Sequence, residues 1–141
     1  MTVYCTPQFK KEYDKLTRKK SYQYIGKEII DIYLDKKIED CLSGTRLNGH
    51  SKNPFIKKRL DGSGGSRLYL VLIIAADSAY LAFIHPKSGS VGYDNISNEK
   101  KAEILDSVYK CIESDELLEV TCCENRENLI FKEPKREIAT V

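Results

Sequence analysis

The longest apolar run of the chain, residues 68–76, constrains the fold more than any other feature. It is too short for a membrane-spanning helix, which needs roughly 20 residues. A glycine-rich link at 61–66 precedes the run and a turn-forming Asp-Ser pair follows it, which predicts a core strand between two turns. Together with the β-prone segments 55–60 and 80–84, the run predicts a three-stranded antiparallel meander.

Helical patterns flank this meander. A first helix is predicted from Pro7, with Thr6 as its N-cap. Its apolar positions recur at i, i+4 and i+7 and are Phe9, Tyr13 and Leu16. A second helical pattern runs over residues 21–42, which predicts a helical hairpin, and Ser97 caps a last helix that ends at 114–115. These patterns predict an α+β fold.

Length and cysteine usage bound the class of protein. With 141 residues the chain has the size of one globular domain, which we expect over residues 1–117. Residues 118–141 form a C-terminal extension with predicted strands at 118–122 and 129–132, which form a hairpin or dock as an extra strand. The N-terminal segment lacks the pattern of a secretory signal, so we expect a cytoplasmic protein. The 5 cysteines contain no CxxC pair, which argues against a disulfide framework or a zinc site.

The charge is divided unevenly along the chain. Residues 1–100 carry 17 Lys or Arg against 11 Asp or Glu, whereas residues 101–141 carry 6 against 10. A basic body suits a polyanion such as nucleic acid, but the same excess also occurs on ordinary solvated helices. Both interpretations stay open on charge alone.

The most informative basic cluster lies around the glycine-rich link. Alternation along 55–60 places Lys57 and Arg59 on one face of the strand and their apolar neighbours on the other. Lys58 interrupts this pattern, either because its stem reaches the sheet edge or because a bulge shifts the register. Such cations on an uncovered sheet face can bind a phosphate, and lysines there can also serve only to discourage edge pairing. Neither histidine lies in a metal-ligand pattern, and we predict no metal and no cofactor.

A wider set of residues carries a family resemblance over residues 2–114. The segments are Leu47-Asn48-Gly49, Ile56-Lys57-Lys58-Arg59-Leu60, Gly64-Gly65-Ser66-Arg67-Leu68-Tyr69, Phe83-Ile84-His85-Pro86-Lys87, and Tyr93. Together with the two leading helices, they resemble the RelE/ParE superfamily of type II toxins. The resemblance implies an α+β fold in which two N-terminal helices pack on one face of a small antiparallel β-sheet. A C-terminal helix and short extra strands would complete it.

The resemblance also implies a function. RelE-like members enter the ribosomal A site and cut mRNA without a metal, using the 2′-OH of the RNA as the nucleophile. This predicts a translation-inhibiting endoribonuclease whose partners are mRNA on the ribosome and a cognate protein antitoxin. ParE-like members instead inhibit DNA gyrase, and a catalytically inactive protein-binding relative is a further alternative. The acidic tail then either shields the basic face or closes the sheet, and we favour closure.

Carried over position by position, the resemblance makes Lys57 the candidate base. An ordinary lysine is protonated at neutral pH, so this role requires neighbouring cations that favour the neutral amine.

The same carry-over gives roles to other predicted site residues. It makes Arg59 and Arg67 phosphate clamps, Lys87 a helper or acid, and Tyr93 the ring that stacks on a base. His85 is an alternative proton donor, because an imidazole titrates near neutral pH.

Overall fold

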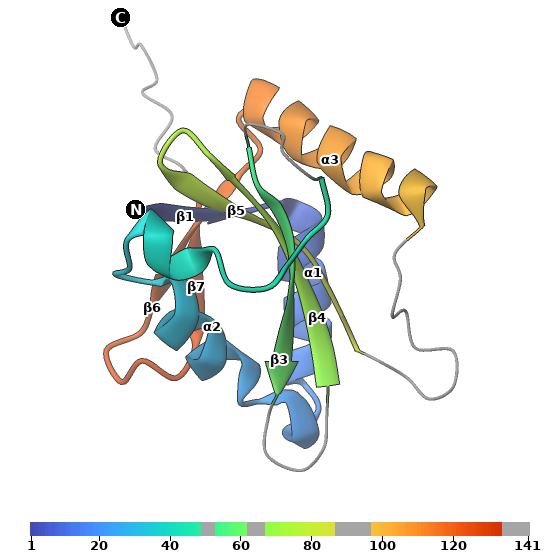
Figure 1. Ribbon diagram of the computed structural model, residues 1–141. Helices are drawn as coiled ribbons and strands as arrows, with labels where there is room; N and C mark the ends of the chain where they lie inside the picture. The colour runs from blue at the N-terminus through green and yellow to red at the C-terminus, as the bar shows by residue number, and fades with distance from the viewer. Residues whose placement is uncertain (49–52, 62–66, 87–96, 134–141) are drawn as a thin grey trace, which may run out of the picture.

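The computed structural model describes residues 1–48, 53–61, 67–86 and 97–133 (Figure 1). Its helices are α1 (Pro7–Thr17), α2 (Ile25–Tyr33) and α3 (Asn98–Glu113), with the short 3-10 helices η1 (Lys20–Tyr22) and η2 (Ile38–Cys41). Its strands are β1 (Thr2–Cys5), β2 (Thr45–Arg46), β3 (Phe55–Asp61), β4 (Arg67–Ala75), β5 (Ser78–Pro86), β6 (Leu118–Cys122) and β7 (Leu129–Lys132). No helix in this described part of the chain is long and apolar enough to span a bilayer. The general α+β class is confirmed.

The sheet is larger than predicted and is mixed. Its 7 strands follow the order β2-β3-β4-β5-β1-β6-β7, and the predicted meander forms its β3-β4-β5 part. The expectation of a small antiparallel sheet is wrong, because β1 runs parallel to β5 and the β6–β7 hairpin joins the other edge of β1. A parallel neighbour needs a crossover between the strands, and α1 and α2 lie in the long connection that leaves β1. Such a distant pairing leaves no signal in the local pattern of a strand as short as β1.

The helices cover both faces of the sheet, which corrects the expected arrangement. One core contains the apolar sides of α1 and α2 together with Leu70, Leu72 and Ile84 of the central strands. A second core lies on the opposite face, where Val71 and Ile73 pack with α3. Figure 1 shows α3 on the other side of the sheet from α1 and α2. The predicted uncovered face is therefore covered in part by α3, because β4 is apolar on both sides and needs two partners.

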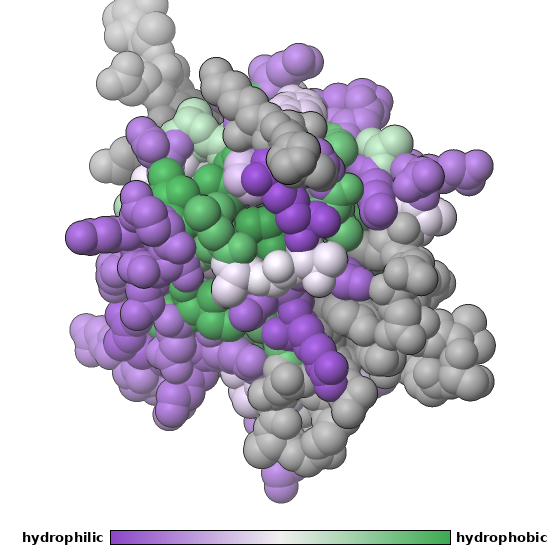
Figure 2. Space-filling model, in the orientation of Figure 1, coloured by the Kyte–Doolittle hydropathy of each residue, from purple (hydrophilic) through white to green (hydrophobic). Residues whose placement is uncertain are grey.

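Figure 2 shows the α3 side of the molecule, with apolar side chains gathered over the middle of the sheet and hydrophilic ones around them. The apolar residues that pack partly buried against the second core are Tyr4, Leu47, Ala75, Phe83, Leu105 and Ile112. Lys57 of β3 shares a row with Val71, which packs with α3, and Arg59 lies one row farther along the strand.

The helix ends follow the local signals, with one exception. Thr6 and Ser97 accept hydrogen bonds at 3.1 Å from the N–H groups of Phe9 and Lys100, as predicted for the two N-caps. The continuous helical pattern over 21–42 is a wrong prediction, since α2 ends at Tyr33 and only η2 follows. Asp35 has a φ of 60° there, a left-handed conformation that cannot continue a helix.

The β6–β7 hairpin belongs to the main core. Val120 and Leu129 are buried with α1 and α2, and the N–H of Leu129 donates a 3.4 Å hydrogen bond to the hydroxyl of Tyr13. At its turn, Arg126 lies 3.1 Å from the carboxylate of Asp35, which joins the hairpin to the end of α2. Both predicted strands of the tail are thus present and extend the sheet.

Candidate nucleic-acid interface

The register of the sheet brings basic residues of β3 and β5 into neighbouring rows. Arg59 stands opposite Tyr69, and Tyr69 stands opposite His85. In the next row Lys57 stands opposite Val71, which stands opposite Phe83. Opposed and alternate residues point to the same face of a sheet, so the β3 and β5 members of both rows lie on the face of Val71, which is the face of α3.

A β-bulge allows this alignment. The β4–β5 register shifts between Val71 and Leu72, so that Val71 pairs with Phe83 while Leu72 pairs with Leu81. The extra residue on β5 is Ala82, and beyond it the strand presents Phe83 and His85 to the α3 face. Without the bulge, His85 would point to the opposite face, where Ile84 is buried.

Arg59 and His85 flank β4 in the same row of the sheet. Their Cα atoms lie two strands apart, which corresponds to about 10 Å at the usual strand spacing. Arg59 is exposed and its guanidinium can offer two parallel N–H donors to a phosphate, while His85 is half-buried. Lys57, also half-buried, adds a further positive charge one row away.

His85 lies in an aromatic and cationic surrounding. Its ring stacks on Phe83 with the centroids 5.7 Å apart, and the ammonium of Lys100 in α3 lies 5.3 Å from the centroid of Phe83. Burial and the charge of Lys100 both lower the pKa of His85. Both effects favour the neutral imidazole, which is the form able to accept a proton.

A carboxyl group of α1 reaches the same region from the other side of β5. Beyond Leu81, β5 no longer pairs with β1, and the N–H of Thr6 donates a 3.1 Å hydrogen bond to the carbonyl of Leu81, which fixes the start of α1 there. Burial raises the pKa of Glu12 to about 7, opposed by Lys100, by the N–H of Ile84 and by Lys15.

Glu12 is also short of hydrogen bonds. Its Oε1 is buried, and within the described ranges of the chain it has no hydrogen-bond partner. Glu12 is a half-buried carboxyl group with a pKa of about 7, and it accepts a hydrogen bond from the N–H of Ile84, the residue before His85. Groups with such shifted pKa values cluster at functional sites.

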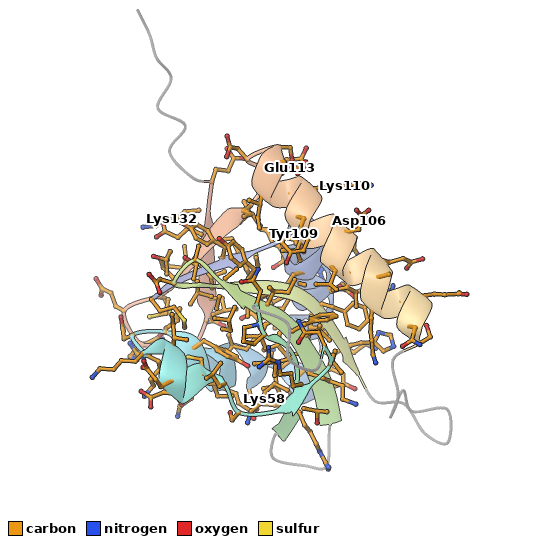
Figure 3. The ribbon with its side chains drawn as sticks, turned by 45° about the horizontal axis from the view of Figure 1, so that its top comes forward. Lys58, Asp106, Tyr109, Lys110, Glu113 and Lys132 are labelled. Carbon is orange, nitrogen blue, oxygen red and sulfur yellow. The ribbon has the colours of Figure 1, made fainter. Side chains whose placement is uncertain are left out.

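Lys58 does not belong to this surface. It lies on the α1 and α2 face of β3, and its ammonium donates a 3.1 Å hydrogen bond to the hydroxyl of Ser43. The β3–β4 register is continuous, so the stem reaches the sheet edge without a bulge (Figure 3). Lys58 therefore serves as a comparison for Lys57 and Arg59.

The other predicted site residues are placed only in part. Arg67 stands opposite Asp61 in the β3–β4 register. Lys87 and Tyr93 lie outside the described residues. The structure thus brings together Lys57, Arg59 and His85 of the predicted set.

Sequence reasoning missed Glu12 and Lys100. Each lies on an amphipathic helix among several similar charges, and neither belongs to a motif. The bulge in β5 and the placement of α3 bring these two residues to the site. Neither feature can be inferred from local sequence patterns.

The described residues were also compared with the ligand sets that bind metal ions. Among the residues that the structure describes, no group of three or more His, Cys, Asp or Glu side chains could hold a metal ion. Comparison with protein-family models, with curated proteins and with solved structures finds no match to this chain.

Proposed function

We propose that this chain is a RelE-like toxin, a metal-independent endoribonuclease that cuts mRNA and is countered by a protein antitoxin. The observation that carries the proposal is the sheet register that places Arg59 of β3 and His85 of β5 in one row, with Lys57 in the next row. The general α+β class is also compatible with the proposal, although the sheet is larger than the resemblance implies and helices cover both of its faces.

The proposed reaction needs a base, a positive charge and an acid. The 2′-oxygen forms a bond to the adjacent phosphorus while the bond to the 5′-oxygen breaks, which leaves a 2′,3′-cyclic phosphate and a 5′-hydroxyl. His85, with its lowered pKa, suits the removal of the 2′-OH proton. Arg59 and Lys57 suit the negative charge that develops on the phosphorane. The acid that protonates the 5′-oxygen is Lys87 in this proposal.

This assignment differs from the one that the resemblance implies for Lys57. A lysine must lose its proton before it can act as a base, whereas a neutral imidazole is ready to accept one. We therefore propose His85 as the base and Lys57 as a source of positive charge. Arg67 and Tyr93 keep the roles that the resemblance implies.

The proposal is tested by mapping RNA 5′ ends by primer extension after brief induction of the protein in cells. Arg59→Met removes the guanidinium from the row, and Lys58→Met removes a neighbouring cation from the opposite face of the same strand. Both variants should unfold at a similar temperature, which shows that any difference in cleavage does not come from the fold. Blocking translation in a parallel culture tests the dependence on the ribosome.

New 5′ ends inside codons, lost with Arg59→Met and kept with Lys58→Met, would support the nuclease. Cleavage that survives Arg59→Met would refute the proposed site. Arrest of growth without new RNA ends would refute the nuclease and favour inhibition of gyrase or another target. Unaffected growth with intact RNA would leave an inactive binding protein as the better account.

A further inference from the structure

Lys100 connects the three groups that surround the end of β5. Its ammonium lies over Phe83, the ring that stacks on His85, and its charge acts on both His85 and Glu12. Its side chain is 48% exposed, and its carboxylate neighbour Glu103 lies 3.7 Å away and is 71% exposed. An exposed ion pair of this kind contributes little free energy, so it does not prevent the ammonium from binding another anion.

Glu12 completes the arrangement from the inner side. Its Oε1 is buried, and the part of the protein that is described offers that atom no hydrogen-bond donor. The cations that act on this carboxyl group are Lys100 of α3 and Lys15 of α1, with Lys100 the stronger of the two. The charge state of Glu12 therefore depends on whether the positive charge of Lys100 is available to it.

We infer that Lys100 binds a phosphate of the RNA strand and that Glu12 takes up a proton from solvent when this phosphate binds. The inference rests on the proposed function, since it adds a binding residue and a proton-linked partner to the same site. A bound phosphate neutralises Lys100 and places a second negative charge near the buried carboxylate. Protonation of Glu12 removes the resulting repulsion.

The same reasoning predicts the number of protons taken up when one molecule of RNA binds. At pH 8 a carboxyl group with a pKa of about 7 is roughly one tenth protonated. An upward shift of one pKa unit on binding would leave half of it protonated, an uptake of ~0.4 proton per molecule bound. His85 contributes little at pH 8, because its pKa is already lowered in the free protein.

The probe is a short 2′-O-methyl oligoribonucleotide with hydroxyl groups at both ends, which the protein cannot cleave through a 2′-OH. Isothermal titration calorimetry at pH 8, in two buffers with different enthalpies of ionisation, gives the affinity and the proton uptake together. The variants are Lys100→Met and Glu12→Gln. The matched control is Lys110→Met, on the outer side of the same helix, where Lys110 lies 2.8 Å from Asp106 (Figure 3).

Lys100→Met should weaken binding and make the slope of log K against log salt less negative by about 0.7, the value for one phosphate contact on a single strand. Lys110→Met should change neither. Glu12→Gln should bind at least as tightly as the unchanged protein, without the proton uptake. His85→Asn should keep that uptake.

An affinity and salt slope unchanged by Lys100→Met, or absence of binding by the unchanged protein, would overturn the inference. Proton uptake that persists in Glu12→Gln would overturn the role of Glu12. These outcomes are separate from the test of the nuclease. If the protein binds the probe as described but yields no new RNA ends, only the nuclease is refuted. If it cuts RNA, and Lys100→Met changes neither the affinity nor the salt slope, only the inference is refuted.

Discussion

Replacing Glu12 with glutamine should stabilise the folded protein at pH 8 and leave its stability at pH 5 nearly unchanged. Burial raises the pKa of Glu12 from 4.5 to about 7 in the folded state. Between these two values the folded protein binds more protons than the unfolded chain, so its free energy of unfolding falls as the pH rises. Glutamine cannot lose a proton, and its amide oxygen can still accept from the N–H of Ile84.

The size of the effect follows from the same shift. A difference of about 2.5 pKa units, at about 1.4 kcal/mol for each unit, sets an upper limit of roughly 3 kcal/mol. Glu12 is only half-buried, and solvent screens part of this energy, so we expect a gain of about 1–2 kcal/mol at pH 8. Most of the gain should disappear below pH 5, where Glu12 is protonated in the folded protein.

Urea unfolding at pH 5, 6.5 and 8, followed by circular dichroism, measures the difference. The control is Glu103→Gln, which removes an exposed carboxylate beside Lys100 and should change stability by less than about 0.5 kcal/mol at every pH. A Glu12→Gln variant that is less stable than the parent at pH 8, or equally stabilised at pH 5, would refute the claim that the carboxylate is destabilised by burial.

Two further predictions concern the scaffold that holds the site. Gly26→Ala should lower the free energy of unfolding by about 1–3 kcal/mol in urea titrations, although alanine favours helices, because the new Cβ would lie 2.5 Å from the Tyr13 hydroxyl and 2.7 Å from the carbonyl of Glu127. An unchanged midpoint would show that α2 and the β6–β7 turn do not touch as described. Thr6→Ala should lower the free energy of unfolding by about 1 kcal/mol, because it removes the cap on the N–H of Phe9. Thr6→Ser keeps this hydrogen bond and should lose less stability. Equal losses in the two variants would show that the methyl group matters and the hydrogen bond does not.

Local signals predicted the elements whose cause is local. The first helix begins where Thr6 can cap it and Pro7 can occupy its first turn, and the last helix begins at Ser97 for the same reason. The alternation of β3 was also readable, since Ile56 and Leu60 are buried against the helices while Arg59 is exposed. These features depend on residues that are close in sequence.

Features that depend on distant partners were not readable in this way. The parallel pairing of β1 with β5 joins Thr2 to Ser78, and α3 covers Val71 and Ile73 from the other end of the chain. A run that is apolar on both faces shows that two layers must cover it, but it does not say which helix supplies the second layer. The same holds for the site. Strand alternation predicts that Lys57 and Arg59 lie on one face of β3, whereas no local pattern predicts that Glu12 and Lys100 lie near them.

The position of α3 explains how one sheet face can serve both stability and binding. Where α3 crosses, the rows of β3, β4 and β5 are apolar, and Val71 and Ile73 are almost fully buried. The row of Val71 also holds Lys57 and Phe83, so the change from core to charged surface occurs within a single row. Lys100 lies in the first turn of α3 and contacts this row at Phe83, which means that the helix that closes the core also delivers a cation to its border. A substitution that moved α3 would therefore disturb His85 and Glu12 before it unfolded the sheet, and binding of the oligoribonucleotide should respond to such changes more strongly than stability does.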